Sequence, residues 1–149
     1  MEKLNSIIFY NIDKAIRAYR NFAQRQLKLH GFAITIDQWL IIKAILENPE
    51  ITQNEIGNLV FKDNASVTRI IDLLVKSEYV IRTIHAKDRR KTNLEVTESG
   101  LKIIKDVQKV VENNRKTALH GISEEELQIM NNALLKISDN TITLKNKAR

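Results

Sequence analysis

The chain has 149 residues, of which 43% are hydrophobic, enough for one domain with its own core, or for one domain with a helical extension. It contains no cysteine, which excludes thiol catalysis, cysteine metal sites and disulfides. The formal net charge is +6, and residues 80–91 alone hold five Lys or Arg residues against one Asp. Such clustering favours a polyanionic partner such as nucleic acid, although many charged loops are only solvated.

The beginning of the chain resembles neither a signal peptide nor a membrane span, because the apolar stretch at residues 7–10 is short and charged residues soon follow. We therefore expect a cytoplasmic protein with no membrane partner. No glycine-rich phosphate loop, nucleophile motif or metal-ligand spacing occurs, and the three histidines lie far apart. The sequence thus predicts no catalytic residue, no metal site and no cofactor.

The chain has few helix breakers, with four glycines and one proline, and regular helix-start signals, which predicts a mostly helical fold. Residues 6–30 carry apolar side chains at three- and four-residue steps, which indicates one long amphipathic helix, and Gly31 can cap its end. Capping boxes at residues 35–38 and 52–55 begin two further helices, and Pro49 separates them. In the second of these, three apolar residues are expected to face inward: Ile56, Leu59 and Val60.

A fourth helix is predicted over residues 63–77, with Asp63 as its N-cap. Its core face is formed by apolar residues at helical spacing: Val67, Ile70, Ile71 and Leu74. The opposite face, at ~100° per residue, carries small, hydrogen-bonding and charged side chains: Ala65, Ser66, Thr68, Arg69, Asp72 and Lys76. Two short helices joined by a tight connection in this way form a helix-turn-helix.

A β-hairpin is predicted next, because residues 79–84 and 92–96 are β-branched or alternating runs on either side of a basic stretch. A hairpin directly after a helix-turn-helix is a wing. Two amphipathic helices follow, one capped by Thr97 and one opened by a capping box at residues 123–126. A winged helix-turn-helix of ~65 residues cannot cover all the apolar stripes of the terminal helices, so a two-fold partner is the simplest cover.

Several short motifs stand at a distinctive spacing. They are Gln38-Trp39 at a helix start, residues 52–59, Ser66-Val67-Thr68-Arg69, Asp88-Arg89-Arg90, and Leu94, Val96, Thr97 and Gly100. Through these motifs, residues 35–100 resemble the MarR family of bacterial winged-helix transcription regulators. The resemblance implies a mostly α fold with a small β-hairpin wing, in which a winged helix-turn-helix DNA-binding domain at residues 35–97 is flanked by helical dimerisation regions at 1–34 and 98–149. It also implies a homodimeric repressor of palindromic double-stranded DNA, relieved by a small-molecule effector.

Within this resemblance, the helix over residues 63–77 enters the major groove with its N-terminal half at the bases. The residues expected to contact DNA there are Asn64, Ala65, Ser66, Thr68 and Arg69. Arg69 can donate to guanine O6 and N7, and Ala65 can pack against a thymine methyl group. The alternative for the polar residues is helix capping or ordinary solvent-facing polarity.

At the wing, the resemblance implies an arginine in the minor groove, where narrow A·T-rich sequence concentrates negative potential. The wing residues assigned to DNA are Lys87, Asp88, Arg89, Arg90 and Lys91. Arg90 corresponds to the family's signature arginine and Asp88 to the acid that pairs with it, while the other three supply phosphate contacts. The alternative is a solvated hairpin tip.

Many members of the family bind small aromatic or lipophilic effectors between the dimerisation helices and the winged domain. The candidate ligand residues here are Tyr19, Phe22, His30, Phe32 and Trp39. Tyr19 and His30 can pair with a carboxylate or phenol, whereas ordinary core packing is the alternative for Phe22 and Trp39. Two other functions stay open, namely an effector-independent architectural DNA-binding protein and a helical protein–protein adaptor that binds no duplex.

Overall fold

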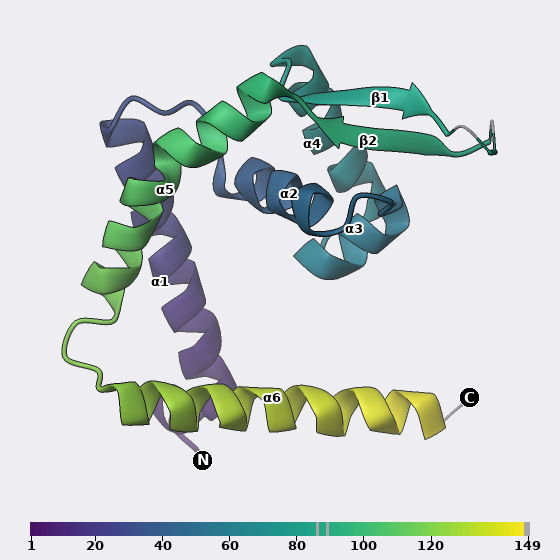
Figure 1. The fold of residues 1–149 in the computed structure, drawn as a ribbon. Coiled ribbons are helices and arrows are strands. Elements are labelled where there is room, and N and C mark those ends of the chain that lie inside the picture. Colours follow the sequence, from purple (N-terminus) through teal and green to yellow (C-terminus); the bar gives the residue numbers. More distant parts are fainter. Residues whose placement is uncertain (86, 89, 148–149) are drawn as a thin grey trace. The chain divides into compact units, whose positions relative to one another are not determined.

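The computed structural model describes residues 1–85, 87–88 and 90–147 (Figure 1). Its elements are η1 (Leu4–Ser6), α1 (Ile8–Leu29), α2 (Ile36–Glu47), α3 (Gln53–Val60), α4 (Asn64–Lys76), β1 (Val80–Ile84), β2 (Thr92–Val96), α5 (Glu98–Ala118) and α6 (Glu124–Lys147). The predicted mostly helical fold with one hairpin is confirmed. The chain divides into two compact units, residues 1–114 and 115–149. None of the described helices has the length and hydropathy that a membrane span requires.

Three helices begin at the capping boxes that the sequence predicts. The hydroxyl oxygens of Thr35, Thr52 and Ser123 each accept a hydrogen bond from the backbone amide three residues later, at 3.1, 3.3 and 3.1 Å. The side chain of that later residue accepts from the N-cap amide in return, at 3.0, 2.7 and 2.8 Å. These reciprocal bonds satisfy amides that have no partner inside a helix, so the starts of α2, α3 and α6 are fixed by local sequence.

One core holds α2, α3, α4, the hairpin and the first part of α5 together. Its fully buried side chains are Ile34, Ile41, Ile42, Ile56, Val67, Ile71, Leu74, Val80 and Val107. Three of the four residues predicted for the core face of α4 are fully buried, and Ile70 packs against the cluster. Helix α1 contributes one buried residue to this cluster, Leu27.

Leu59 does not face inward as predicted, since its side chain is 54% exposed. The close approach of α3 to the start of α4 explains this, because the face of α3 that meets α4 is centred on Gly57. A Cβ atom at Gly57 would lie 2.8 Å from the carbonyl oxygen of Lys62, so only glycine fits. Leu59 is two residues further along and therefore points ~200° away from that face.

The connection between α3 and α4 is short, as predicted, and contains an unusual backbone conformation. Phe61 ends α3 with φ 59°, in the left-handed region, and its side chain is 93% exposed. Lys62 follows, and its amide donates to the carbonyl oxygen of Gly57 at 2.9 Å. The chain thus turns within three residues before α4 begins, which is the geometry of a helix-turn-helix.

The two strands form an antiparallel hairpin in which Val80 lies opposite Val96 and Arg82 opposite Leu94. The base of the hairpin is packed, because Val80 and Leu94 are buried and Arg82 forms an ion pair with Asp72 of α4. The hairpin projects beyond α2, α3 and α4 in Figure 1. Its tip is therefore carried on a base that is fixed to α4.

The junction between the hairpin and α5 uses the predicted Thr97 cap. The Thr97 hydroxyl accepts from the Gly100 amide at 3.0 Å and donates to the Glu78 carbonyl oxygen at 2.5 Å. Gly100 is required here, because a Cβ atom would lie 2.2 Å from the carbonyl oxygen of Tyr79. This contact anchors the start of α5 to the segment that leaves α4.

Candidate nucleic-acid interface

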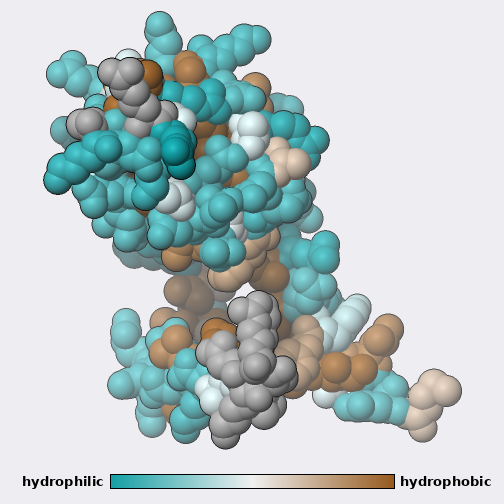
Figure 2. Space-filling view, turned by 90° about the vertical axis from the view of Figure 1, so that its right-hand side faces the viewer, coloured by the Kyte–Doolittle hydropathy of each residue, from teal (hydrophilic) through white to brown (hydrophobic). Residues whose placement is uncertain are grey.

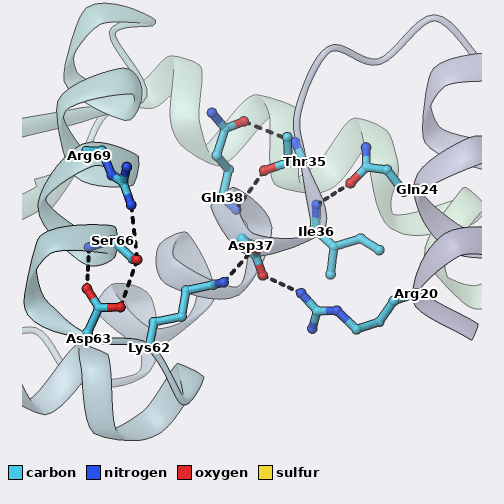
Figure 3. A network of polar contacts seen from close by, with 10 residues as sticks. All are labelled: Arg20, Gln24, Thr35, Ile36, Asp37, Gln38, Lys62, Asp63, Ser66 and Arg69. Atoms are coloured by element: carbon cyan, nitrogen blue, oxygen red, sulfur yellow. Dashed lines mark hydrogen bonds and ion pairs between the residues drawn. The ribbon is translucent and has the colours of Figure 1, made fainter. Parts of the chain in front are cut away.

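The N-terminal end of α4 carries a small polar cluster. The Asp63 carboxylate accepts from the backbone amide of Ser66 at 2.8 Å and from the Ser66 hydroxyl at 3.0 Å. Arg69 Nη2 donates to the same hydroxyl at 3.3 Å, as Figure 3 shows. The Ser66 amide is the main cause of the lowered pKa of Asp63, and the nearby Arg69 charge lowers this pKa further. The Arg69 guanidinium is therefore held near the electropositive end of its helix.

All five residues predicted to contact DNA from this helix lie on the first two turns of α4, and the structure brings them together. Asn64, Ala65 and Arg69 are exposed, whereas Ser66 and Thr68 are half-buried. The Thr68 hydroxyl donates to the Asn64 carbonyl oxygen at 2.8 Å and accepts from the side-chain amide of Gln53 on α3. Thr68 thus links the two helices of the helix-turn-helix.

Gln53 is a residue of this site that sequence reasoning missed. It begins α3 and lies 15 residues before Thr68, so no local spacing signals the contact. Its side chain ties the first helix of the helix-turn-helix to the outer face of the second. The orientation of α4 against α3 therefore depends on a polar bond as well as on the core.

The wing tip is closed by backbone hydrogen bonds. The His85 amide donates to the Lys91 carbonyl oxygen, and the Lys91 amide donates to the Asp88 carbonyl oxygen, both at 3.0 Å. The Asp88 carboxylate accepts from the backbone amide of Arg90 at 3.0 Å. Among the ion pairs of the described residues, none joins Asp88 to the Arg90 guanidinium. Asp88 therefore shapes the turn through the backbone of Arg90.

The described cations of the wing tip, Lys87, Arg90 and Lys91, are exposed and form no ion pair within the described part of the chain. Arg89, also predicted to contact DNA, lies outside the described residues. The face of the winged-helix region seen in Figure 2, which looks toward the end of the wing, is mainly hydrophilic. In contrast, Arg82 at the base of the wing is neutralised by Asp72. The tip is thus the part of the hairpin whose positive charge remains available.

The residues predicted to bind an effector are distributed over α1, α2 and the loop between them. Tyr19, Phe22, Phe32 and Trp39 are half-buried, and His30 is exposed, with its Nδ1 2.8 Å from the Gln26 carbonyl oxygen. Phe32 and Trp39 pack against the core cluster. The indole Nε1 of Trp39 is buried and has no hydrogen-bond partner among the described residues. A buried donor without an acceptor is costly, so this atom is the unusual one of the set.

The residues that the structure describes do not form a site for metal-dependent chemistry. They form no cluster of His, Cys, Asp or Glu side chains that could hold a metal ion. A shallow hollow of about 730 Å³ lies between the end of α2 and α3, and its lining includes none of the predicted effector residues.

A helix-turn-helix followed at once by a two-stranded antiparallel hairpin defines a winged-helix protein, and the exposed basic tip is typical of one that binds DNA. Residues 34–92 match the model of the MarR family. The family model thus confirms, for this winged-helix segment, the resemblance that its motifs predict. Members of the family are transcription regulators and not enzymes.

Solved structures with the same fold cover nearly the whole chain. The transcriptional regulator SlyA is 24% identical, with a TM-score of 0.79, over 90% of this chain and 93% of that one. BpsR of Bordetella bronchiseptica is 16% identical, with a TM-score of 0.83, over 93% and 98% of the two chains. MepR of S. aureus, solved with DNA, is 21% identical, with a TM-score of 0.76, over 91% and 96%. At these identities the comparison establishes a shared fold that includes the terminal helices.

Proposed function

We propose that the protein is a homodimeric repressor that binds a palindromic DNA operator in the cytoplasm and is released from it by a small-molecule effector. The observation that carries the DNA-binding part is the pairing of two exposed features, the polar N-terminal half of α4 and the cationic wing tip. The MepR structure, which contains DNA, supports the same use of this fold.

The two features suit the two grooves of duplex DNA. A single α-helix fits the major groove, where the forked donors of Arg69 can meet guanine O6 and N7. Asn64 and Ala65 are exposed beside it and would reach neighbouring bases, while Ser66 aligns the arginine. The wing is a narrow hairpin, and its Arg90 would enter the minor groove while Lys87 and Lys91 contact phosphates.

The homodimer is supported by apolar side chains that the single chain leaves exposed. On α1 these include Ile8, Phe9 and Ile16, and on α6 they include Ile129, Met130, Leu134, Leu135 and Ile142. Soluble proteins rarely expose so many large apolar residues unless a partner covers them. Because a two-fold dimer presents α4 twice, its target would be two inverted half-sites about one helical turn apart.

The effector is supported by the buried Nε1 of Trp39, which has no acceptor among the described residues. A small aromatic acid can offer a carboxylate oxygen to such a donor and a ring to half-buried Tyr19 and Phe22. His30 lies at the end of the same helix, α1. BpsR is regulated by 6-hydroxynicotinic acid, a ligand of this chemical type, so this compound is a suitable first probe.

The test begins by selecting the preferred duplex from a randomised pool and footprinting the protein on it. A single protected palindrome is expected, because two copies of α4 read two half-sites. Addition of an aromatic acid that occupies the Trp39 region should release the duplex. Uniform coating of DNA without an effector response would favour an architectural protein instead, and failure to bind any duplex at low salt would favour a protein–protein adaptor.

Two variants separate base reading from charge. Arg69→Ala should relax preference at one base pair, at a cost of ~1–3 kcal/mol for the preferred base. Arg90→Ala should weaken binding to all duplexes. It should also reduce the salt slope, which is the fall of log affinity with log salt concentration, by about 1. Lys102→Ala is the matched control, since Lys102 is a cation of α5 that pairs with Asp106. Equal affinity of the wild type and both variants for the selected operator would overturn the assignment.

A further inference from the structure

One carboxylate in this chain meets cations from two other elements. Asp37 lies in the first turn of α2, and its Oδ1 accepts a hydrogen bond from Arg20 of α1. Its Oδ2 lies 3.2 Å from Nζ of Lys62, in the connection between α3 and α4. The side chains of Arg20, Asp37 and Lys62 are only 40, 31 and 29% exposed. Figure 3 shows the carboxylate between the two cations.

Two apolar side chains of α1, Ala23 and Leu27, are buried, and polar bonds also join α1 to α2. Leu27 is the residue of α1 that belongs to the core cluster. In these polar bonds, the Gln24 side-chain oxygen accepts from the Ile36 amide at 3.0 Å, beside the Arg20–Asp37 pair. Charge-assisted hydrogen bonds are directional, whereas apolar contacts are not. The angle of α1 at this end therefore depends on Asp37 and its neighbours.

On the other side, Lys62 leads directly into α4. Its backbone amide is held by the Gly57 carbonyl oxygen, and the next residue is Asp63, the N-cap of α4. Asp63 in turn holds Ser66, which accepts from Arg69. A continuous path of polar contacts and backbone thus runs from α1, through Asp37, to the arginine proposed to read DNA.

We propose that Asp37 is a positioning residue that sets the angle between α1 and α4. The inference rests on the proposed function, in which α1 belongs to the dimer interface and α4 to the DNA. In such a dimer, a change of this angle in both subunits changes the separation of the two copies of α4. Asp37 therefore determines how strictly the protein requires one spacing between the two half-sites.

The first test compares Asp37→Asn with the wild type on the selected palindrome and on duplexes whose half-sites are moved apart or together by one or two base pairs. Asparagine keeps the shape and removes the charge, so both cations lose their ion pair. Affinity for the correct spacing should fall about threefold to tenfold, and the preference over the wrong spacings should fall by at least about threefold, the size expected when partly exposed ion pairs are lost.

The matched control is Asp13→Asn. Asp13 pairs with Arg17 at 2.9 Å, but both residues lie on α1, so the pair joins no second element. This variant removes the same charge and should leave the spacing preference unchanged. An equal effect of the two variants would show that net charge, rather than position, is responsible, and would overturn the proposal.

Lys62→Gln tests whether the lysine acts through Asp37 or binds a phosphate itself. If it acts through Asp37, the double variant with Asp37→Asn should bind no more weakly than Asp37→Asn alone, and the salt slope should not change. A further loss of affinity with a smaller salt slope in the double variant would assign Lys62 to the phosphates and contradict its place in this path.

A measurement without DNA keeps the inference distinct from the proposed function. Because the chain has no cysteine, spin labels can be placed at Arg25→Cys on α1 and Lys76→Cys on α4, both exposed positions. Diluting the labelled chain with unlabelled chain isolates the distance within one subunit. Asp37→Asn should broaden this distance distribution, and Asp13→Asn should not. A wild type that binds no duplex would overturn the proposed function, whereas a distribution unchanged by Asp37→Asn would overturn the positioning role alone.

Discussion

Similar apolar patterns occur in the winged-helix region and in the C-terminal helix α6, but their side chains are buried in the first and exposed in the second. On α4, Val67, Ile71 and Leu74 recur at three- and four-residue steps and are fully buried within the chain. On α6, large apolar residues recur at similar steps, yet Ile129 and Leu135 are 63 and 55% exposed. Periodicity identifies the apolar face of a helix but not the surface that covers it. The winged-helix region contains its own core, whereas the apolar residues of α6 stay exposed and are those that the proposed dimer would bury.

The largest effect, a loss of stability, is expected from a substitution in the core of the winged-helix region. Ile71→Ala removes a fully buried side chain of α4 and leaves a cavity, which should lower the free energy of unfolding by ~2–5 kcal/mol. Leu73→Ala is the control, because Leu73 lies on the same helix and is half exposed. Urea unfolding at one fixed protein concentration measures both. Similar losses for the two variants would mean that the two faces of α4 are not distinct in solution.

A smaller effect, and one on assembly rather than on folding, is expected on α6. Leu135→Glu places a charge among apolar residues that the proposed dimer buries, which should weaken dimerisation about 10- to 100-fold. Asn132→Glu introduces the same charge at an exposed polar position, ~60° around the helix from both Ile129 and Leu135, and should have a smaller effect. Sedimentation over a range of concentrations measures the dissociation constant. A dimer of unchanged strength in Leu135→Glu would place the interface elsewhere.

The smallest effect concerns the polar start of α4. Hydrogen bonds from Ser66 hold the pKa of Asp63 below its ordinary value of 3.8. The ionised carboxylate therefore stabilises the fold fully above that ordinary value, and this stabilisation is lost as the pH falls through the lower, folded-state pKa. Asp63→Asn keeps an N-cap but does not titrate, so its urea midpoint should fall less steeply between about pH 5 and pH 2. Parallel pH profiles of the two proteins would contradict the role of the charge.

Local features of the fold were predictable from the sequence because they join residues three positions apart. The capping boxes at Thr35, Thr52 and Ser123 are of this kind, and each is present. The inward position of Leu59 was wrong because it depends on the close approach of α3 to α4 at Gly57. That approach is a tertiary contact, which helical periodicity does not contain.

The same distinction applies to the candidate site. The sequence places five candidate residues on one end of α4 and a basic stretch on the wing, since both follow from helix phase and hairpin position. It does not predict that Asp37 joins Arg20 and Lys62, which lie 17 residues before and 25 residues after it along the chain. Nor does it predict that the Asp88 carboxylate meets the backbone of Arg90 and not its guanidinium. The Asp37 contacts are determined by the packing of elements that are distant in sequence, and the Asp88 contact is determined by the geometry of a turn.

The bond between Gln53 and Thr68 bears on how such a protein could acquire a new operator. Thr68 lies among the candidate base-reading residues, yet its hydroxyl already joins α3 to α4 and caps the Asn64 carbonyl oxygen. Substitution at Thr68 would therefore disturb the scaffold together with the recognition surface. Asn64, Ala65 and Arg69 are exposed and carry no bond to another helix among the described contacts. Libraries intended to retarget the protein should vary these three positions and keep Gln53 and Thr68 as a constant pair.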